Sequence, residues 1–331
     1  MHGVVDASVL VVGGGAVGGV TAALMEGRVR RVVVLDANEQ HAALMRDPGL
    51  EFDELGSVRT VSLATCSSPA QLEGPFDFAL VTLKAGALES ALPALRGRAD
   101  AFVAMGNGLV HERVGRLLGD ERVIAGTVEL GATNVGPGRL RQTTRNPYVI
   151  GELDGTGSER AERLAEVLAT TGSGVHVTAN MRGQIWSKLL VNSTFSALGA
   201  VSGGLYRDVA STQEGRRAIV AVWSEGHAIG MAQGLELEHV LGIDPAELAA
   251  GSQTAIDVVI EHAGETEASM LQDLRRGLPT EVGVINGGVV ERARTLGIDA
   301  PRNARIVELV EGFGRGEGEP SPSHLAELGR T

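Results

Sequence analysis

The 331-residue chain lacks several features that define whole classes of protein. It has a single cysteine, Cys66, so no disulfide can form within the chain, and a reducing compartment is expected. No stretch approaches about 18 unbroken apolar residues, the length that a membrane-spanning helix needs. No block of like charges occurs. The net charge of −12 argues against nucleic acid as a partner, because phosphate binding needs clustered lysine and arginine.

Metal-binding and targeting signals are also missing. The eight histidines are scattered, without an H-E-x-x-H pattern or a Cys/His cluster, so we expect no metal site. The N-terminal stretch MHGVVDASVLVV has neither the basic region nor the cleavage signal of a secretory leader. With 43% hydrophobic and 21% charged residues, the composition is that of a soluble globular protein. Together with the single cysteine, it leads us to expect a cytoplasmic location.

The distribution of apolar residues changes once, near residue 180. Upstream, nearly continuous β-branched runs alternate with helical stretches, as in a parallel sheet that is covered on both faces. These runs predict strands at 8–12, 30–35, 76–83 and 99–105, and a helix at 18–26. Downstream, longer runs with helical spacing predict helices at 213–234, 244–264, 280–297 and 303–313.

The segment VVGGGAVGG ends the first predicted strand and opens the first helix. Its G-x-G-x-x-G pattern, in this strand–turn–helix context, is typical of dinucleotide-binding loops. Gly13 would permit the tight turn, Gly15 the approach of a pyrophosphate, and Gly18 the close packing of helix on sheet. The N–H groups that open the helix, at Ala16 and Val17, would bind phosphate oxygens. The alternative is a merely flexible glycine turn.

Asp36 ends the second predicted strand, 18 residues after Gly18. A carboxylate at this position would accept hydrogen bonds from the ribose hydroxyls of the adenosine, and it would repel the 2′-phosphate of NADP. This favours NAD as the cofactor. Alternatively, Asp36 caps a helix that begins within DANEQ.

Polar residues follow two further strands, with Lys84 after ALVTL and Asn107 after AFVAM. In an open α/β sheet, ligands gather at the carboxyl ends of the strands, so both side chains are candidate ligand contacts. The alternatives are a solvated lysine and an asparagine that serves a turn.

The stretch WSKLLVNSTFS (186–196) places polar residues on an otherwise apolar helix. Lys188, Asn192 and Ser196 are four residues apart, and such a step drifts by only about 40° around the axis of an α-helix. We interpret the resulting polar stripe as one wall of an active site. The alternative is that Lys188 buries its stem and extends its amine into water.

These patterns predict an α/β Rossmann-type dinucleotide-binding domain at 1–180, followed by an all-α C-terminal domain at 181–315. The helical domain would contribute the substrate-binding and catalytic groups. Residues 316–331 are polar and rich in glycine and proline, and we expect them to form a frayed tail.

Several motifs resemble those of the ketopantoate reductase (2-dehydropantoate 2-reductase) family. In chain order they are GGGAVGG, VTLKAG, GNG and WSKLLVNS. A fifth, ASMLQDLRRGLPTEVGVINGG at 268–288, is similar to the family's S-S-M-x-Q-D…T-E-I-x-x-I-N-G. The resemblance extends to about residue 313, and it implies an active site in the cleft between the two domains.

The resemblance also implies roles for single residues. Lys188 is similar to the family's general acid, which protonates the ketone oxygen as hydride arrives. Glu281 is similar to the acid that binds the substrate hydroxyl, although an acid in the first turn of a helix also suits the helix dipole. The other implied contacts, with substrate or with the nicotinamide end of the cofactor, are Asn107, Asn192, Ser269 and Lys84.

Two positions depart from the family pattern. Ser196 stands where the family often has a second asparagine, so this candidate substrate contact leaves the identity of the substrate open. The family usually takes NADPH and often has a basic residue after the second strand, where this chain has Asp36 and Ala37. The expected cofactor is therefore NAD(P)H, with NADH favoured by Asp36 and NADPH by the habit of the family.

The expected activity is the NAD(P)H-dependent reduction of a small, ketopantoate-like 2-keto acid to the 2-hydroxy acid, a step of pantothenate biosynthesis. Two alternatives stay open: a paralogous reductase of another keto acid or of an imine, as in opine-type dehydrogenases, and a non-catalytic dinucleotide-binding regulator. The expected partner is the small keto acid, without nucleic acid or membrane. A homodimer stays open as well.

Overall fold

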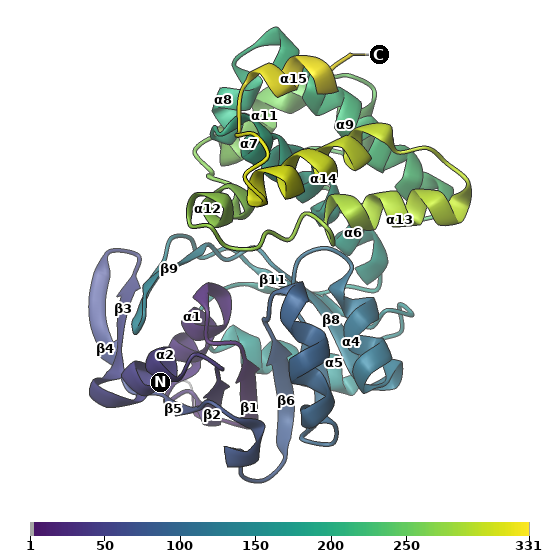
Figure 1. Ribbon diagram of the computed structural model, residues 1–331. Coiled ribbons are helices and arrows are strands. Elements are labelled where there is room, and N and C mark those ends of the chain that lie inside the picture. The colour runs from purple at the N-terminus through teal and green to yellow at the C-terminus, as the bar shows by residue number, and fades with distance from the viewer. Residues whose placement is uncertain (1–2, 331) are drawn as a thin grey trace. The chain divides into compact units, whose positions relative to one another are not determined.

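A computed structural model describes residues 3–330 of the chain (Figure 1). The chain folds into two compact units. The first extends to Met181 apart from residues 107–109, and these three residues belong with the second unit, which begins at Arg182. Each unit is considered by itself below.

The first unit is built on an eight-stranded sheet with the strand order β12-β11-β8-β7-β6-β1-β2-β5. All neighbouring pairs are parallel except β11 and β8, which are antiparallel. Its strands are β1 (Val5–Val12), β2 (Val29–Leu35), β5 (Ala64–Cys66), β6 (Phe76–Val81), β7 (Ala99–Ala104), β8 (Val123–Val128), β11 (Tyr148–Gly151) and β12 (Val175–Val177). The order reverses between β1 and β6, which is the point where such sheets bind ligands. The predicted α/β Rossmann-type fold is confirmed.

A second, four-stranded sheet belongs to the same unit and was not predicted. Its order is β4-β3-β10-β9, and its strands are β3 (Leu50–Glu54), β4 (Ser57–Val61), β9 (Ala132–Gly136) and β10 (Arg139–Gln142). The helices of the unit are α1 (Ala16–Met25), α2 (Glu39–Leu44), α3 (Leu88–Ala91), α4 (Val110–Leu118) and α5 (Glu159–Ala169). Leu140 of β10 packs so closely on Gly19 of α1 that a Cβ at Gly19 would collide with it.

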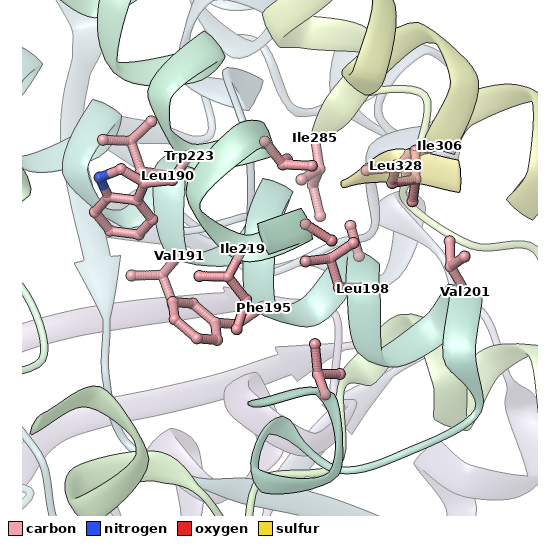
Figure 2. Packing of buried hydrophobic residues seen from close by; sticks show 14 of the residues in the cluster. Leu190, Val191, Phe195, Leu198, Val201, Ile219, Trp223, Ile285, Ile306 and Leu328 are labelled. Atoms are coloured by element: carbon pink, nitrogen blue, oxygen red, sulfur yellow. The ribbon is translucent and has the colours of Figure 1, made fainter. Parts of the chain in front are cut away.

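The second unit is helical, as predicted. Its helices are α6 (Met181–Val191), α7 (Ala197–Ser202), α8 (Tyr206–Ala210), α9 (Gln213–Ala232), α10 (Pro245–Ala249), α11 (Gln253–Ala263), α12 (Ser269–Arg275), α13 (Asn286–Leu296), α14 (Pro301–Gly314) and α15 (Ser323–Leu328). A π-helical turn, Asn192–Ser196, joins α6 to α7. Figure 2 shows the buried cluster at the centre of this unit, in which Phe195 and Leu198 lie among side chains of other helices.

Two predicted helices differ from those observed. The single helix expected at 244–264 is divided at Gly251, which has a positive φ of 88°, and a new helix begins after the cap Ser252. Asp244 is the N-cap of α10, and its carboxylate accepts a hydrogen bond from the N–H of Ala246. The helix expected at 280–297 begins only at Asn286, because residues 282–285 form turns.

Residues 316–330 are not simply a frayed tail, and Thr331, the last residue of that prediction, lies outside the described residues. The segment contains α15, and two of its leucines, Leu325 and Leu328, are each 2% exposed within the core of the helical unit. Their burial fixes an otherwise polar segment. Within residues 3–330, none of the helices combines the length and the apolar character required to cross a bilayer.

Candidate functional site

The glycine loop has the geometry that its sequence suggests. Gly13 adopts a positive φ of 102°, which L-residues with a side chain rarely tolerate. A Cβ on Gly18 would collide with the carbonyl oxygen of Gly13 and with the hydroxyl of Thr82, so glycine is required for the close approach of α1. At Gly15 a Cβ would meet no heavy atom within 4 Å, which leaves that side of the loop open. Phosphate binding by this loop stays a prediction.

Asp36 lies directly beside the glycine loop. One carboxylate oxygen accepts the N–H of Gly14 at 2.7 Å, and the other accepts the N–H of Asn38 at 2.8 Å. Asp36 does not cap the following helix, because Asn38 is the cap of α2 and accepts the N–H of His41. A carboxylate can accept about four hydrogen bonds, so these two contacts leave room for ribose hydroxyls.

Lys84 is exposed at the third position after β6, the neighbour of β1 at the point where the strand order reverses. Between strand and lysine, Thr82 donates its hydroxyl to the carbonyls of Val12 (3.1 Å) and Gly13 (2.8 Å). The carboxyl end of β6 is therefore attached to the glycine loop, and Lys84 lies on the same edge of the sheet.

In the helical unit, three predicted residues from distant parts of the chain form one hydrogen-bonded group. Asn107 donates its side-chain amide to a carboxylate oxygen of Glu281 at 3.1 Å. Asn192 donates to the amide oxygen of Asn107 at 3.4 Å, at the long end of hydrogen-bond distances. We call Asn107, Asn192 and Glu281 the polar triad. All three side chains are partly exposed, so the triad can be reached by a ligand.

The backbone around Glu281 rules out one alternative for this residue. Glu281 lies five residues before α13, and its carbonyl accepts the N–H groups of Val284 and Ile285 in the preceding turns. Because it is not in the first turn of a helix, stabilisation of a helix dipole does not explain this acid. Gly108 packs against the same turn, where a Cβ would collide with the carbonyl of Val284.

Lys188 lies on α6, four residues before Asn192 of the polar triad, and its side chain is half-buried. The two residues that precede Lys188 attach the helix to other parts of the same unit. Trp186 is 2% exposed and donates its indole N–H to the carbonyl of Gly226 in α9 at 3.1 Å. Ser187 accepts the N–H of Glu238 at 2.8 Å. These contacts fix the direction in which α6 presents its lysine.

The π-helical turn that follows α6 depends on Asn286, to which the sequence analysis assigned no role. Asn286 is fully buried, and its amide donates to the carbonyl of Ser193 at 2.8 Å and to the side-chain oxygen of Asn303 at 3.0 Å. A π-turn departs from the regular i→i−4 ladder, and such turns are frequent at functional sites. Asn286 therefore supports the turn that begins with Asn192.

We expect Asn286→Ala to lower the free energy of unfolding by about 1–3 kcal/mol, because the carbonyl of Ser193 would lose a buried donor. Thermal or urea unfolding measures the effect. The exposed Asn146 is the matched control, and Asn146→Ala should change stability by less than about 0.5 kcal/mol. Equal stability of the two variants would show that Asn286 does not support the π-turn.

Ser196 is placed differently from the stripe that regular helical spacing predicts. Ser196 is the last residue of the π-turn and is only 5% exposed. Its hydroxyl lies 2.6 Å from the hydroxyl of Tyr206, whose pKa is raised by burial. The structure thus gives Ser196 a partner inside the helical unit, and a substrate contact would require this hydrogen bond to be shared or broken.

Ser196→Ala is expected to destabilise the protein by about 1–3 kcal/mol, since it leaves the buried hydroxyl of Tyr206 without its partner. The KM for the keto acid should be unchanged. Tyr206→Phe removes the same hydrogen bond from the other side and is the matched control. A KM that rises in Ser196→Ala but not in Tyr206→Phe would restore Ser196 to the substrate site.

Ser269 is exposed at the first position of α12. No contact with the polar triad supports its predicted role, which therefore stays a prediction.

The composition carries one signal that the sequence analysis missed. The chain has 29 basic residues, and only two of them, Lys84 and Lys188, are lysines. The other basic residues are all arginines, and many of them form ion pairs on the surface, such as Arg139 with Glu51 and Arg141 with Asp53. Lysine differs from arginine in that its amine can release a proton near neutral pH. Lysine is thus confined to the two positions for which site roles were predicted.

Comparisons with known proteins agree with these observations. Models of the ketopantoate reductase PanE/ApbA family match residues 9–155, and models of its C-terminal domain match residues 180–313. A 2-dehydropantoate 2-reductase of Halobacterium salinarum is 26% identical over 305 residues, which are 91% of this chain and 97% of that protein.

Solved structures give the same result. A PanE/ApbA family ketopantoate reductase from Ralstonia eutropha JMP134 superimposes with a TM-score of 0.81 at 25% identity, over 94% of this chain and 99% of the other. A D-mandelate dehydrogenase with NADH and anilino(oxo)acetate has the same fold, with a TM-score of 0.82, 20% identity and coverage of 94% and 99%. The chain belongs to the ketopantoate reductase family, a family of oxidoreductases.

Proposed function

We propose that this protein reduces a ketopantoate-like 2-keto acid to the 2-hydroxy acid with a nicotinamide dinucleotide as the hydride donor. The observation that carries the proposal is the polar triad of Asn107, Asn192 and Glu281, whose member Asn192 lies one helical turn along the chain from Lys188. A carboxylate, two amides and an amine are the groups that bind a hydroxylated keto acid and protonate its carbonyl oxygen.

The proposed chemistry divides between bound cofactor and protein. A nicotinamide bound in this protein would supply hydride to C2 of the keto acid, and negative charge would then develop on the carbonyl oxygen. The ammonium group of Lys188 stabilises that charge and donates the proton that completes the hydroxyl group. Glu281 accepts a hydrogen bond from a substrate hydroxyl, and Asn107 holds the carboxylate of Glu281 in place.

For the dinucleotide, the first unit offers the glycine loop and Asp36. The open side at Gly15 fits a pyrophosphate, and the remaining lone pairs of Asp36 fit ribose hydroxyls. Each hydrogen bond from a ribose hydroxyl to this carboxylate is worth about 1.5–3 kcal/mol. The 2′-phosphate of NADPH would be repelled instead. The D-mandelate dehydrogenase with the same fold binds NADH, which supports NADH as the cofactor here.

We therefore expect NADH to be preferred over NADPH in kcat/KM by about tenfold or more, equivalent to about 1.4 kcal/mol. Steady-state kinetics with ketopantoate and each cofactor measures the preference. Asp36→Asn should reduce it, and Asp100→Asn, at an exposed position of β7, should not. Equal or better kinetics with NADPH would contradict the role of Asp36 while leaving the reductase activity intact.

The same assay tests the substrate. Ketopantoate and phenylglyoxylate, the keto acid that corresponds to D-mandelate, should be compared at saturating cofactor, each with and without an added amine. Turnover of ketopantoate that exceeds the turnover of phenylglyoxylate, without an added amine, supports the proposal. Turnover that requires the amine would indicate an imine reductase, and binding of cofactor without any turnover would indicate a non-catalytic regulator.

A further inference from the structure

His41 is a buried histidine of the first unit that neither the sequence analysis nor the proposed chemistry uses. It lies on α2, is 3% exposed, and connects two loops that are far apart in the sequence. Its Nε2 is 2.7 Å from the carbonyl oxygen of Gly14 in the glycine loop. Its Nδ1 is 2.9 Å from the amide nitrogen of Gly138, in the turn between β9 and β10.

These two partners determine the state of the imidazole ring. A carbonyl oxygen can only accept, so Nε2 must carry a proton and donate to Gly14. A backbone N–H can only donate, so Nδ1 must be without a proton and accept from Gly138. His41 is thus neutral, with its proton on Nε2, and both ring nitrogens bond to backbone.

The contact with Gly14 has a consequence for the neighbouring residue. The Gly14 carbonyl and the N–H of Gly15 belong to one planar trans peptide and point in opposite directions. By holding that carbonyl, His41 directs the N–H of Gly15 away from itself. A Cβ at Gly15 would meet nothing within 4 Å, so the loop is open at this residue.

The preceding peptide of the loop is fixed as well. Asp36 accepts the N–H of Gly14 at 2.7 Å, and Thr82 donates to the carbonyl of Gly13 at 2.8 Å. Gly14 itself has no space for a side chain, because a Cβ there would lie 2.8 Å from the methyl carbon of Met45 and 2.9 Å from Val34. The peptide between Gly14 and Gly15 is the one that His41 holds, through the carbonyl of Gly14.

We infer that His41 is a positioning residue for dinucleotide binding, which orients the N–H of Gly15 toward a pyrophosphate oxygen through the peptide that links Gly14 to Gly15. The inference rests on the proposed dinucleotide site in the glycine loop. The N–H of Gly138, in the turn between β9 and β10, holds the ring of His41 in place. The four-stranded sheet therefore supports the glycine loop through His41.

Three substitutions separate this role from mere packing. His41→Phe keeps the ring and loses both hydrogen bonds. His41→Gln can place an amide N–H near the position of Nε2 and so retains the donor to Gly14. His41→Asn can place its oxygen near the position of Nδ1 but is too short to reach Gly14. His176→Phe, at an exposed position of β12 in the same unit, is the matched control.

The measurements are the Kd of NADH from its fluorescence, the KM of each substrate, and the melting temperature. We expect the Kd and KM of NADH to rise about tenfold in His41→Phe and His41→Asn, with recovery to within about threefold in His41→Gln. The KM of the keto acid should change by less than about twofold in all three. If His41→Phe does not fold, the comparison of Gln with Asn decides.

Two results would overturn the inference. In the first, all His41 variants bind NADH as tightly as the unmodified protein, whatever their melting temperatures. The inferred role of His41 would then be wrong, and the proposed function would be unaffected. In the second, the unmodified protein binds neither NADH nor NADPH, and the dinucleotide site falls together with the role of His41.

Discussion

Lys188→Ala is expected to lower kcat by about 10²–10⁴-fold, the range in which general acids contribute to catalysis. Raising the concentration of keto acid should not restore the rate, because the lost interaction belongs to the transition state. The melting temperature and the Kd of NADH should stay near those of the unmodified protein, since the contacts of Trp186 and Ser187 hold α6 in either variant. Steady-state kinetics and thermal unfolding of the same preparation measure all three quantities.

Lys188→Arg distinguishes charge from proton donation. Arginine keeps a positive charge at this position but remains protonated in proteins, so it can stabilise the developing alkoxide without releasing a proton. We expect its kcat to lie between those of Lys188→Ala and the unmodified protein. Arg182→Ala, at an exposed position of the same helix, is the control and should change neither kcat nor stability appreciably. A near-normal kcat in Lys188→Ala would show that the lysine is not the proton donor.

The sequence sufficed to predict those parts of the molecule whose signal is local. The glycine pattern predicts the turn at Gly13 and the close packing at Gly18, because neither position tolerates a Cβ. The continuous apolar runs predict the parallel strands. The four-stranded sheet escaped prediction because its strands are short and polar. Their pairing depends on partners elsewhere in the chain, such as Arg139 with Glu51 and Arg141 with Asp53.

The polar stripe shows why helical spacing alone misplaced one residue. Regular α-helical geometry groups Lys188, Asn192 and Ser196 on one face, but at the end of the π-turn Asn192–Ser196 the hydroxyl of Ser196 is buried against that of Tyr206. That turn is supported by Asn286, which is 93 residues away from Ser193. A local pattern cannot reveal a support of this kind. The burial of Leu325 and Leu328 in α15 likewise depends on the packed core and not on the Gly/Pro-rich sequence that precedes them.

Asn107→Asp is expected to lower kcat/KM by about 10- to 100-fold at neutral pH, although the side chain keeps its size and shape. The hydrogen bond from Asn107 to the carboxylate of Glu281 is charge-assisted and worth about 1.5–3 kcal/mol. The substitution removes this donor and places a second carboxylate beside that of Glu281. The two negative charges would then repel each other.

The pH dependence of this variant has a defined sign. A carboxylate beside a second carboxylate has a raised pKa, so lowering the pH should protonate one of the pair first. The protonated carboxyl group is again a donor, and it restores the contact that the amide of Asn107 makes. The ratio of kcat/KM between Asn107→Asp and the unmodified protein should therefore rise as the pH falls. Asn107→Ala has no group to protonate, and its ratio should stay low at every pH. Parallel pH profiles for Asp and Ala would show that Asn107 does not act through Glu281.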